Sequence, residues 1–106
     1  MQKRIVHKCY SIDIAPKYCY LYFGKDMVAR RKFNDSEIEL ETINKMIDKY
    51  IKNSGYTHYL QILSWAGIKA DRKDENVYLE YLSSEYVTLL RRLKNRVSEV
   101  LTNEIV

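Results

Sequence analysis

The chain has 106 residues, of which 46% are apolar and 30% are charged, and its formal net charge is +4. We expect residues 1–106 to form a single domain, because a chain of this length buries about 60 to 70% of its unfolded surface. The composition excludes a disordered chain. The longest uncharged run ends at Ile68 and is too short and too polar to span a bilayer. No signal peptide is visible, so we expect a cytoplasmic protein without membrane contact.

Residues 3–33 predict an antiparallel sheet of three strands. Apolar and polar residues alternate over 3–14, with Val6 on the apolar side, as in a half-buried strand. A block of β-favouring residues covers 18–23. A Gly-Lys-Asp turn signal then precedes a third strand over 27–33.

Helical patterns follow the sheet. Ser36 and Glu39 have the spacing of a capping box, and Asn53-Ser54-Gly55 is expected to end the first helix. The second segment is compatible with helix or strand, although its Tyr and Leu residues share a helical face. Ser83-Ser84 is expected to kink the last helix or to split off its first part. We therefore expect an α+β fold, with a three-stranded sheet packed on one face by about three helices, at 36–53, 56–66 and 76–102.

The positive charge is concentrated at the start of the chain. The first 33 residues contain eight Lys or Arg and two Asp, together with six Tyr or Phe. Cations release counterions from a phosphate backbone, and aromatic faces stack on bases, so this mixture suits nucleic acid. Tyr and Arg are also enriched at protein interfaces, and the same mixture suits an acidic protein surface.

Strand alternation predicts which side chains face away from the helices. A turn at Ala15-Pro16 places the tyrosines of 18–23 on the open side of the sheet, with Tyr22 opposite Cys9. The next turn brings Arg30 and Lys32 beside them and puts Met27 on the core side. It also puts Arg31 on the core side, which argues against this register. The candidate binding residues are Tyr18, Tyr20, Tyr22, Arg30, Lys32 and His7.

Three functions remain open at this point. The first is a small non-catalytic module that binds nucleic acid through this face. The alternative is an inhibitor that binds a nucleic-acid-processing protein, such as a viral or mobile-element anti-defence protein, because the abundance of Lys, Ile, Asn and Tyr follows AT-rich codons. The third is a small metal-independent nuclease.

Catalytic and metal sites have little support in the sequence. His7 and His58 are the only histidines, and neither lies in a catalytic motif. Cys9 and Cys19 do not have zinc-site spacing relative to them, so we expect free thiols, no metal and no cofactor.

The last helix carries an apolar seam that is longer than a small sheet requires. Its members recur at three- and four-residue steps. Part of the seam can therefore pair with a second copy. We expect Leu93 and Val97 at the interface of a homodimer.

Overall fold

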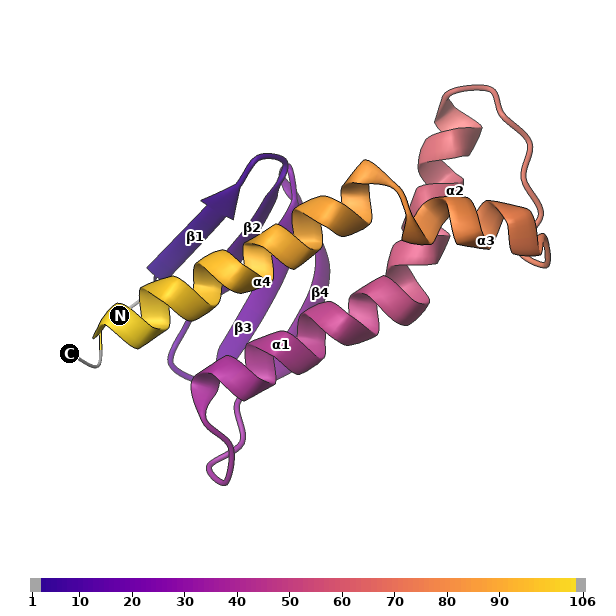
Figure 1. Cartoon of the computed structure of the whole chain (residues 1–106). Coiled ribbons are helices and arrows are strands. Elements are labelled where there is room, and N and C mark those ends of the chain that lie inside the picture. Colours follow the sequence, from indigo (N-terminus) through magenta and orange to yellow (C-terminus); the bar gives the residue numbers. More distant parts are fainter. Residues whose placement is uncertain (1–2, 105–106) are drawn as a thin grey trace.

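The computed structural model describes residues 3–104, which form an antiparallel sheet beside a layer of helices (Figure 1). The fold is α+β, and the four strands lie side by side in chain order. The strands are β1 (Lys3–His7), β2 (Tyr10–Ile14), β3 (Tyr18–Phe23) and β4 (Asp26–Lys32). The helical segments are α1 (Glu39–Lys49), the π-helical turn η1 (Tyr50–Ser54), α2 (Gly55–Trp65), α3 (Glu75–Leu82) and α4 (Glu85–Glu104).

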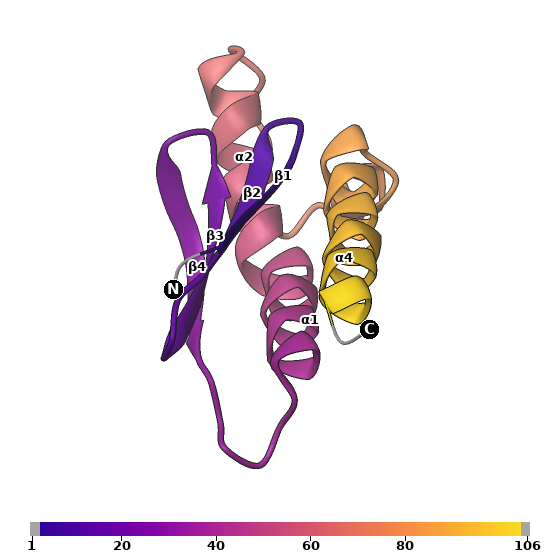
Figure 2. The same cartoon turned by 90° about the vertical axis from the view of Figure 1, so that its left-hand side faces the viewer.

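Two long helices cover one face of the sheet (Figure 2). α1 packs on β3 and β4, and α4 packs on β1 and β2. α2 and α3 extend beyond the end of the sheet (Figure 1). The expected numbers are therefore wrong, because the sheet has four strands where three were predicted and two helices cover it where about three were predicted.

The strand predicted over 3–14 is a hairpin. Lys8 has a φ of 55° and forms a two-residue turn with Cys9, so the chain reverses between β1 and β2. Odd-numbered residues of β1 consequently lie beside even-numbered residues of β2. Ile5 pairs with Ile12 and is buried, whereas Val6, predicted on the core side, points the other way.

The register of β3 differs from the prediction along its whole β2 side and, on its β4 side, only at the end near the hairpin turn. Tyr22 pairs with Ser11 of β2, which is two residues away from the expected partner. Side chains alternate with a period of two, so this shift leaves the tyrosines on the predicted face. On the other side, the predicted pairing of Tyr20 with Arg30 and of Tyr18 with Lys32 is confirmed.

A β-bulge changes the first half of β4. Leu21 pairs with Ala29 and Tyr22 with Met27, which leaves Val28 as the extra residue. Val28 and Ala29 both pack toward the helices as a result. Met27 was predicted on the core side, but it is 50% exposed beside Tyr22.

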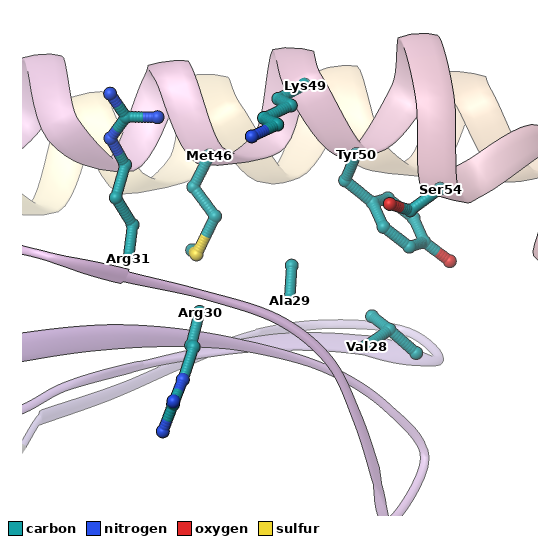
Figure 3. A pocket seen from close by; sticks show the side chains of 8 residues that line it. All are labelled: Val28, Ala29, Arg30, Arg31, Met46, Lys49, Tyr50 and Ser54. Carbon is teal, nitrogen blue, oxygen red and sulfur yellow. The ribbon is translucent and has the colours of Figure 1, made fainter.

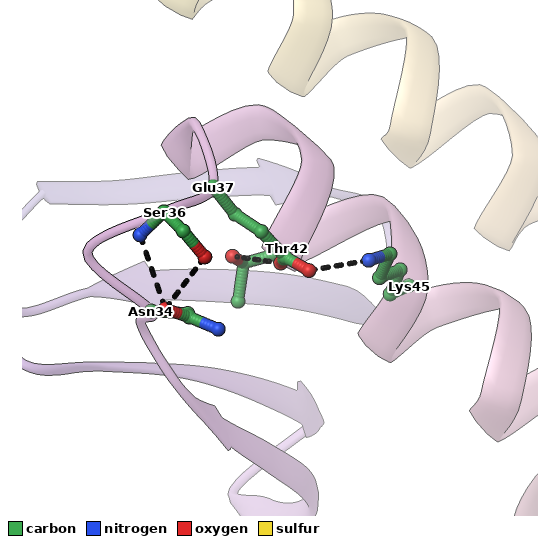
Figure 4. A network of polar contacts seen from close by, with 5 residues as sticks. All are labelled: Asn34, Ser36, Glu37, Thr42 and Lys45. Carbon is green, nitrogen blue, oxygen red and sulfur yellow. Dashed lines mark hydrogen bonds and ion pairs between the residues drawn. The ribbon is translucent and has the colours of Figure 1, made fainter.

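α1 begins after the predicted start, and the capping box does not form. The Ser36 hydroxyl donates to Asn34 Oδ1 at 3.0 Å within the preceding loop (Figure 4). Glu37 instead accepts a hydrogen bond from the buried Thr42 hydroxyl at 3.1 Å and pairs with Lys45 (Figure 4). The carboxylate of Glu37 thereby ties the loop to the first turns of the helix.

The helix also does not end at Gly55. The chain continues from α1 through η1 into α2, and Gly55 is buried. A Cβ at this position would lie 2.1 Å from the Tyr81 hydroxyl and 2.7 Å from the Tyr50 carbonyl oxygen. The Tyr81 hydroxyl donates to the Ile51 carbonyl at 2.8 Å, so the absence of a side chain at Gly55 lets α3 dock against η1.

Other helix predictions hold. α2 confirms a helix over 56–66, and the break between α3 and α4 confirms the split at Ser83-Ser84. No helix in residues 3–104 combines the length and apolarity needed to cross a membrane. The core lies between the sheet and the two covering helices, and its fully buried members include Ile12, Cys19, Leu21, Ile43, Ile47, Leu90, Leu93 and Val97.

Candidate binding surface

The candidate site is the sheet face turned away from α1 and α4, which we call the open face (Figure 2). Cross-strand partners share a face, so the pairing of the strands determines its members. Five of the six predicted binding residues lie on it. The open face consists of Arg4, Val6, Ser11, Asp13, Tyr18, Tyr20, Tyr22, Met27, Arg30 and Lys32.

Two tyrosines form an ordered platform at the β4 side of the open face. The rings of Tyr18 and Tyr20 are stacked, with centroids 6.2 Å apart and planes 29° apart. The Arg30 guanidinium lies over the Tyr18 ring at 5.9 Å from its centroid, a cation–π geometry. Lys32 is the direct cross-strand partner of Tyr18. The structure thus brings together four of the predicted residues.

Arg4 is a member of this face that sequence reasoning missed. Its Nε and Nη2 donate to the two carboxylate oxygens of Asp13 at 2.6 and 2.8 Å. Its guanidinium also lies over the Tyr22 ring at 5.7 Å from the centroid. The sequence carries no signal for this position, because a Lys-Cys turn is not among the favoured hairpin turns and the parity of β1 depends on it.

The far end of the open face is apolar. Val6 and Met27 are 49% and 50% exposed, and they flank the row formed by Ser11 and Tyr22. Their placement follows from the first hairpin and from the bulge in β4. The open face therefore has a cationic, aromatic half around Tyr18 and an aliphatic half around Tyr22.

The charge of the open face is positive. Asp13 is its only carboxylate among the described residues, and the bidentate pair with Arg4 neutralises it. None of the ion pairs among the described residues involves Arg30 or Lys32, and both side chains are exposed. These two cations are available to an anionic partner.

His7 does not belong to this face. It pairs with Tyr10, whose side chain is in the core, so His7 lies on the helix side of β1. Its Nε2 is buried and has no hydrogen-bond partner within the described part of the chain. The prediction was wrong because it extended a single alternating strand through the turn at Lys8.

Leu93 and Val97 do not form an exposed seam. Both are fully buried in one copy of the chain, where α4 packs on β1, β2 and α1. The prediction of an oligomer interface at these residues is therefore wrong. A fourth strand widens the sheet, and the middle of the apolar seam, at Leu89, Leu93 and Val97, is buried where α4 covers it.

A part-buried polar pair lies at the end of the sheet that α2 adjoins. The Tyr50 hydroxyl and His58 Nδ1 are 2.8 Å apart, and the His58 ring packs edge-on against Phe23 with centroids 4.7 Å apart. Burial raises the pKa of Tyr50 to about 12. Burial also lowers the pKa of His58, and the charge of Asp26 opposes this effect. Both groups are consequently neutral at neutral pH. The pair joins η1 to α2, and the ring contact of His58 with Phe23 joins α2 to the sheet.

The thiols and carboxylates do not gather into a site. Cys9 and Cys19 are free thiols, as predicted. Burial raises the pKa of Cys19 to about 11, so this thiol is protonated at neutral pH and is a poor nucleophile. Within residues 3–104, no group of three or more His, Cys, Asp or Glu side chains is placed to hold a metal ion.

The open face combines accessible aromatic rings with cations that form no ion pair among the described residues. Its ring faces accept bases or other flat groups, and its free cations attract phosphates or carboxylates. Function has to be inferred from this geometry. No protein-family model, curated protein or solved structure matches the chain.

Proposed function

We propose that the chain is a small non-catalytic module that binds single-stranded nucleic acid through the open face. The observation that carries this proposal is the stacked pair Tyr18 and Tyr20 with Arg30 held over it and Lys32 beside it. Stacked aromatics with neighbouring cations are the combination that single-strand binders use. The rings accept bases, and the cations follow the backbone.

Stacking energies favour a single strand over a duplex. Each base that stacks on an aromatic side chain contributes about 1 to 3 kcal/mol. Two or three bases on the tyrosines, together with two phosphates on Arg30 and Lys32, are sufficient for measurable affinity at low salt. In a duplex the base faces are already stacked on one another, so only the phosphate contacts remain.

The test is fluorescence anisotropy with a labelled single strand of about ten nucleotides, as DNA and as RNA, at about 50 mM and about 200 mM salt. We expect the single strand to bind more tightly than the matching duplex and its affinity to fall as salt rises. Absence of binding at the lower salt, or a preference for the duplex, contradicts the proposal. The absorbance ratio of the purified protein gives an independent check for co-purified nucleic acid.

A second candidate function rests on the aliphatic half of the open face. Val6 and Met27 are about half exposed on either side of Tyr22, and a nucleic acid gains little from such aliphatic groups. Tyr, Met and Arg are enriched in the centres of protein interfaces. This half therefore suits a protein partner, and an inhibitor of a nucleic-acid-processing protein would use both halves together.

Pull-down from a nuclease-treated lysate distinguishes this second function. Met27→Asp places a charge in the aliphatic half, and Leu79→Asp makes the same change at a 61% exposed apolar residue of α3, far from the sheet. We expect a partner that is captured by the wild type and by Leu79→Asp and lost with Met27→Asp. Equal capture by both variants removes the open face as the protein-binding surface.

A further inference from the structure

β4 forms an edge of the sheet. It is paired with β3 on one side, and within residues 3–104 no other strand pairs with it. An edge strand presents backbone groups that can pair with another chain. The accessible backbone of β4 is therefore a binding element separate from the open face.

The hydrogen-bond pattern shows which residues present these groups. Phe33 donates its backbone N–H to the Lys17 carbonyl at 2.9 Å. Hydrogen-bonded pairs alternate with non-bonded pairs in an antiparallel ladder, so the next bonded pair toward the hairpin is Arg31 with Cys19. The backbone N–H and C=O groups of Arg30 and Lys32 consequently point away from β3.

A groove of about 320 Å³ follows this edge between β4 and the helix layer (Figure 3). We call it the β4–α1 groove. Its walls are half apolar and half polar. The apolar part arises because the bulge places Val28 and Ala29 on the helix side, opposite Met46 and Tyr50. An added strand would have every second side chain directed into this space.

Cations line the rim of the groove. Arg31 points from β4 toward α1, and Lys49 lines the same groove from α1 (Figure 3). The pKa of Glu37 is lowered mainly by hydrogen bonds from Lys45 and Thr42. The positive charge of Arg31 lowers it further by a smaller amount. Neither Arg31 nor Lys49 takes part in the ion pairs of the described residues.

We propose that β4 accepts an extended acidic segment of a partner protein as a fifth strand. The segment pairs with the outward backbone groups of Arg30 and Lys32, and its apolar side chains enter the β4–α1 groove. Its carboxylates meet Arg31 and Lys49. Strand addition of this kind takes affinity from main-chain hydrogen bonds and specificity from pockets for alternate side chains. This site does not depend on nucleic-acid binding by the open face.

The charge of the edge selects against the other obvious occupant. A second copy of the chain, paired edge to edge, would bring Arg30, Arg31 and Lys32 of both copies into one short ladder. Like charges across a strand pair are destabilising, and cations on edge strands prevent such association. The same cations attract an acidic strand.

The experiment titrates the ¹⁵N-labelled full chain with the acetylated peptide Val-Ile-Val-Ile-Asp-Glu-Asp and follows the backbone amide resonances. We expect the largest shift changes and new protection from hydrogen exchange at Arg30 and Lys32. The same peptide with alternate amides N-methylated, and a peptide with Lys in place of its acidic residues, are expected not to bind. Lys49→Glu is expected to weaken binding about tenfold.

The matched control is Lys52→Glu, which reverses an exposed cation of η1 outside the groove. It is expected to leave the affinity unchanged. Equal weakening by both variants, equal binding of the N-methylated peptide, or shifts confined to Tyr18 and Tyr20 overturn the proposal. Displacement of the peptide by a single-stranded oligonucleotide of about ten nucleotides would assign the edge of β4 to nucleic acid. That result would also overturn the proposal.

Discussion

Neighbouring residues of β3 lie in two different environments. Cys19 and Leu21 point toward the helices and have no exposed surface, whereas Tyr18, Tyr20 and Tyr22 are half-buried on the open face. The first set packs against α1 and the rest of the core. Within residues 3–104, the ring contacts of the second set are with side chains of its own face, namely one ring stack and two cation–π contacts.

Under the proposed function, this difference separates stability from recognition along one strand. Transfer of apolar surface from water holds the helix side together, and each lost group there leaves a cavity. On the open face the rings are prearranged but remain accessible to a ligand. Substitutions at consecutive positions should therefore have opposite consequences, and the following predictions test that division.

The largest effect is expected for Leu21→Ala. The side chain is fully buried, so its removal costs the transfer free energy and leaves a cavity, together about 3 kcal/mol in the free energy of unfolding. Denaturant-induced unfolding followed by circular dichroism measures this loss. A change below about 1 kcal/mol would mean that the helix side of β3 is not the core.

Tyr20→Ala is expected to act on binding. Loss of a stacking ring should weaken affinity for a single strand by about tenfold or more, with a loss of stability of about 1 kcal/mol. Tyr20→Phe keeps the ring and is the matched control, with affinity close to that of the wild type. If the two variants bind equally, the ring does not stack on a base.

Arg30→Ala should change how affinity depends on salt. Loss of one phosphate contact reduces the slope of log affinity against log salt by about one. Arg92→Ala removes an exposed arginine of α4 and is expected to leave the slope unchanged. Equal slopes for all three proteins would show that Arg30 does not contact the backbone.

The smallest effect is the pH dependence of stability that His58 causes on the helix side of the sheet. Burial lowers the pKa of His58 below its ordinary value of 6.5, so the unfolded chain binds a proton that the folded chain does not. The free energy of unfolding is therefore highest above about pH 6.5. It decreases as the pH falls from 6.5 toward the lowered pKa of His58 in the folded chain. Unfolding at about pH 7.5 and about pH 5.5 should show lower stability in acid.

His58→Gln is the control for this dependence, since it removes the titrating group and retains His7. The difference in stability between the two pH values should be smaller for the variant than for the wild type. An equal difference in both proteins would assign the acid sensitivity to other groups.

Part of the candidate site could be predicted because it depends on parity. Tyr18, Tyr20 and Tyr22 share a face in any strand, and a register error of two residues relative to β2 does not move them. Arg30 and Lys32 lie on the same face, as predicted. They follow the bulge in the chain, and beyond the bulge Arg30 pairs with Tyr20 and Lys32 with Tyr18. Helical periodicity likewise located α2 and the apolar seam of α4.

The sequence by itself therefore determined the α+β class, the approximate positions of most strand and helix segments and the shared face of the β3 tyrosines, since these follow from side-chain spacing within a few residues. Only the tertiary structure decided how the segments face one another. The turn at Lys8 inverted β1 and exchanged His7 for Arg4 on the open face, and the bulge exposed Met27. The fourth strand widened the sheet until α4 had to bury Leu93. The Lys-Cys turn is local but lacks a favoured hairpin signal, and the other features depend on contacts between distant segments, whose geometry no local pattern of residues encodes.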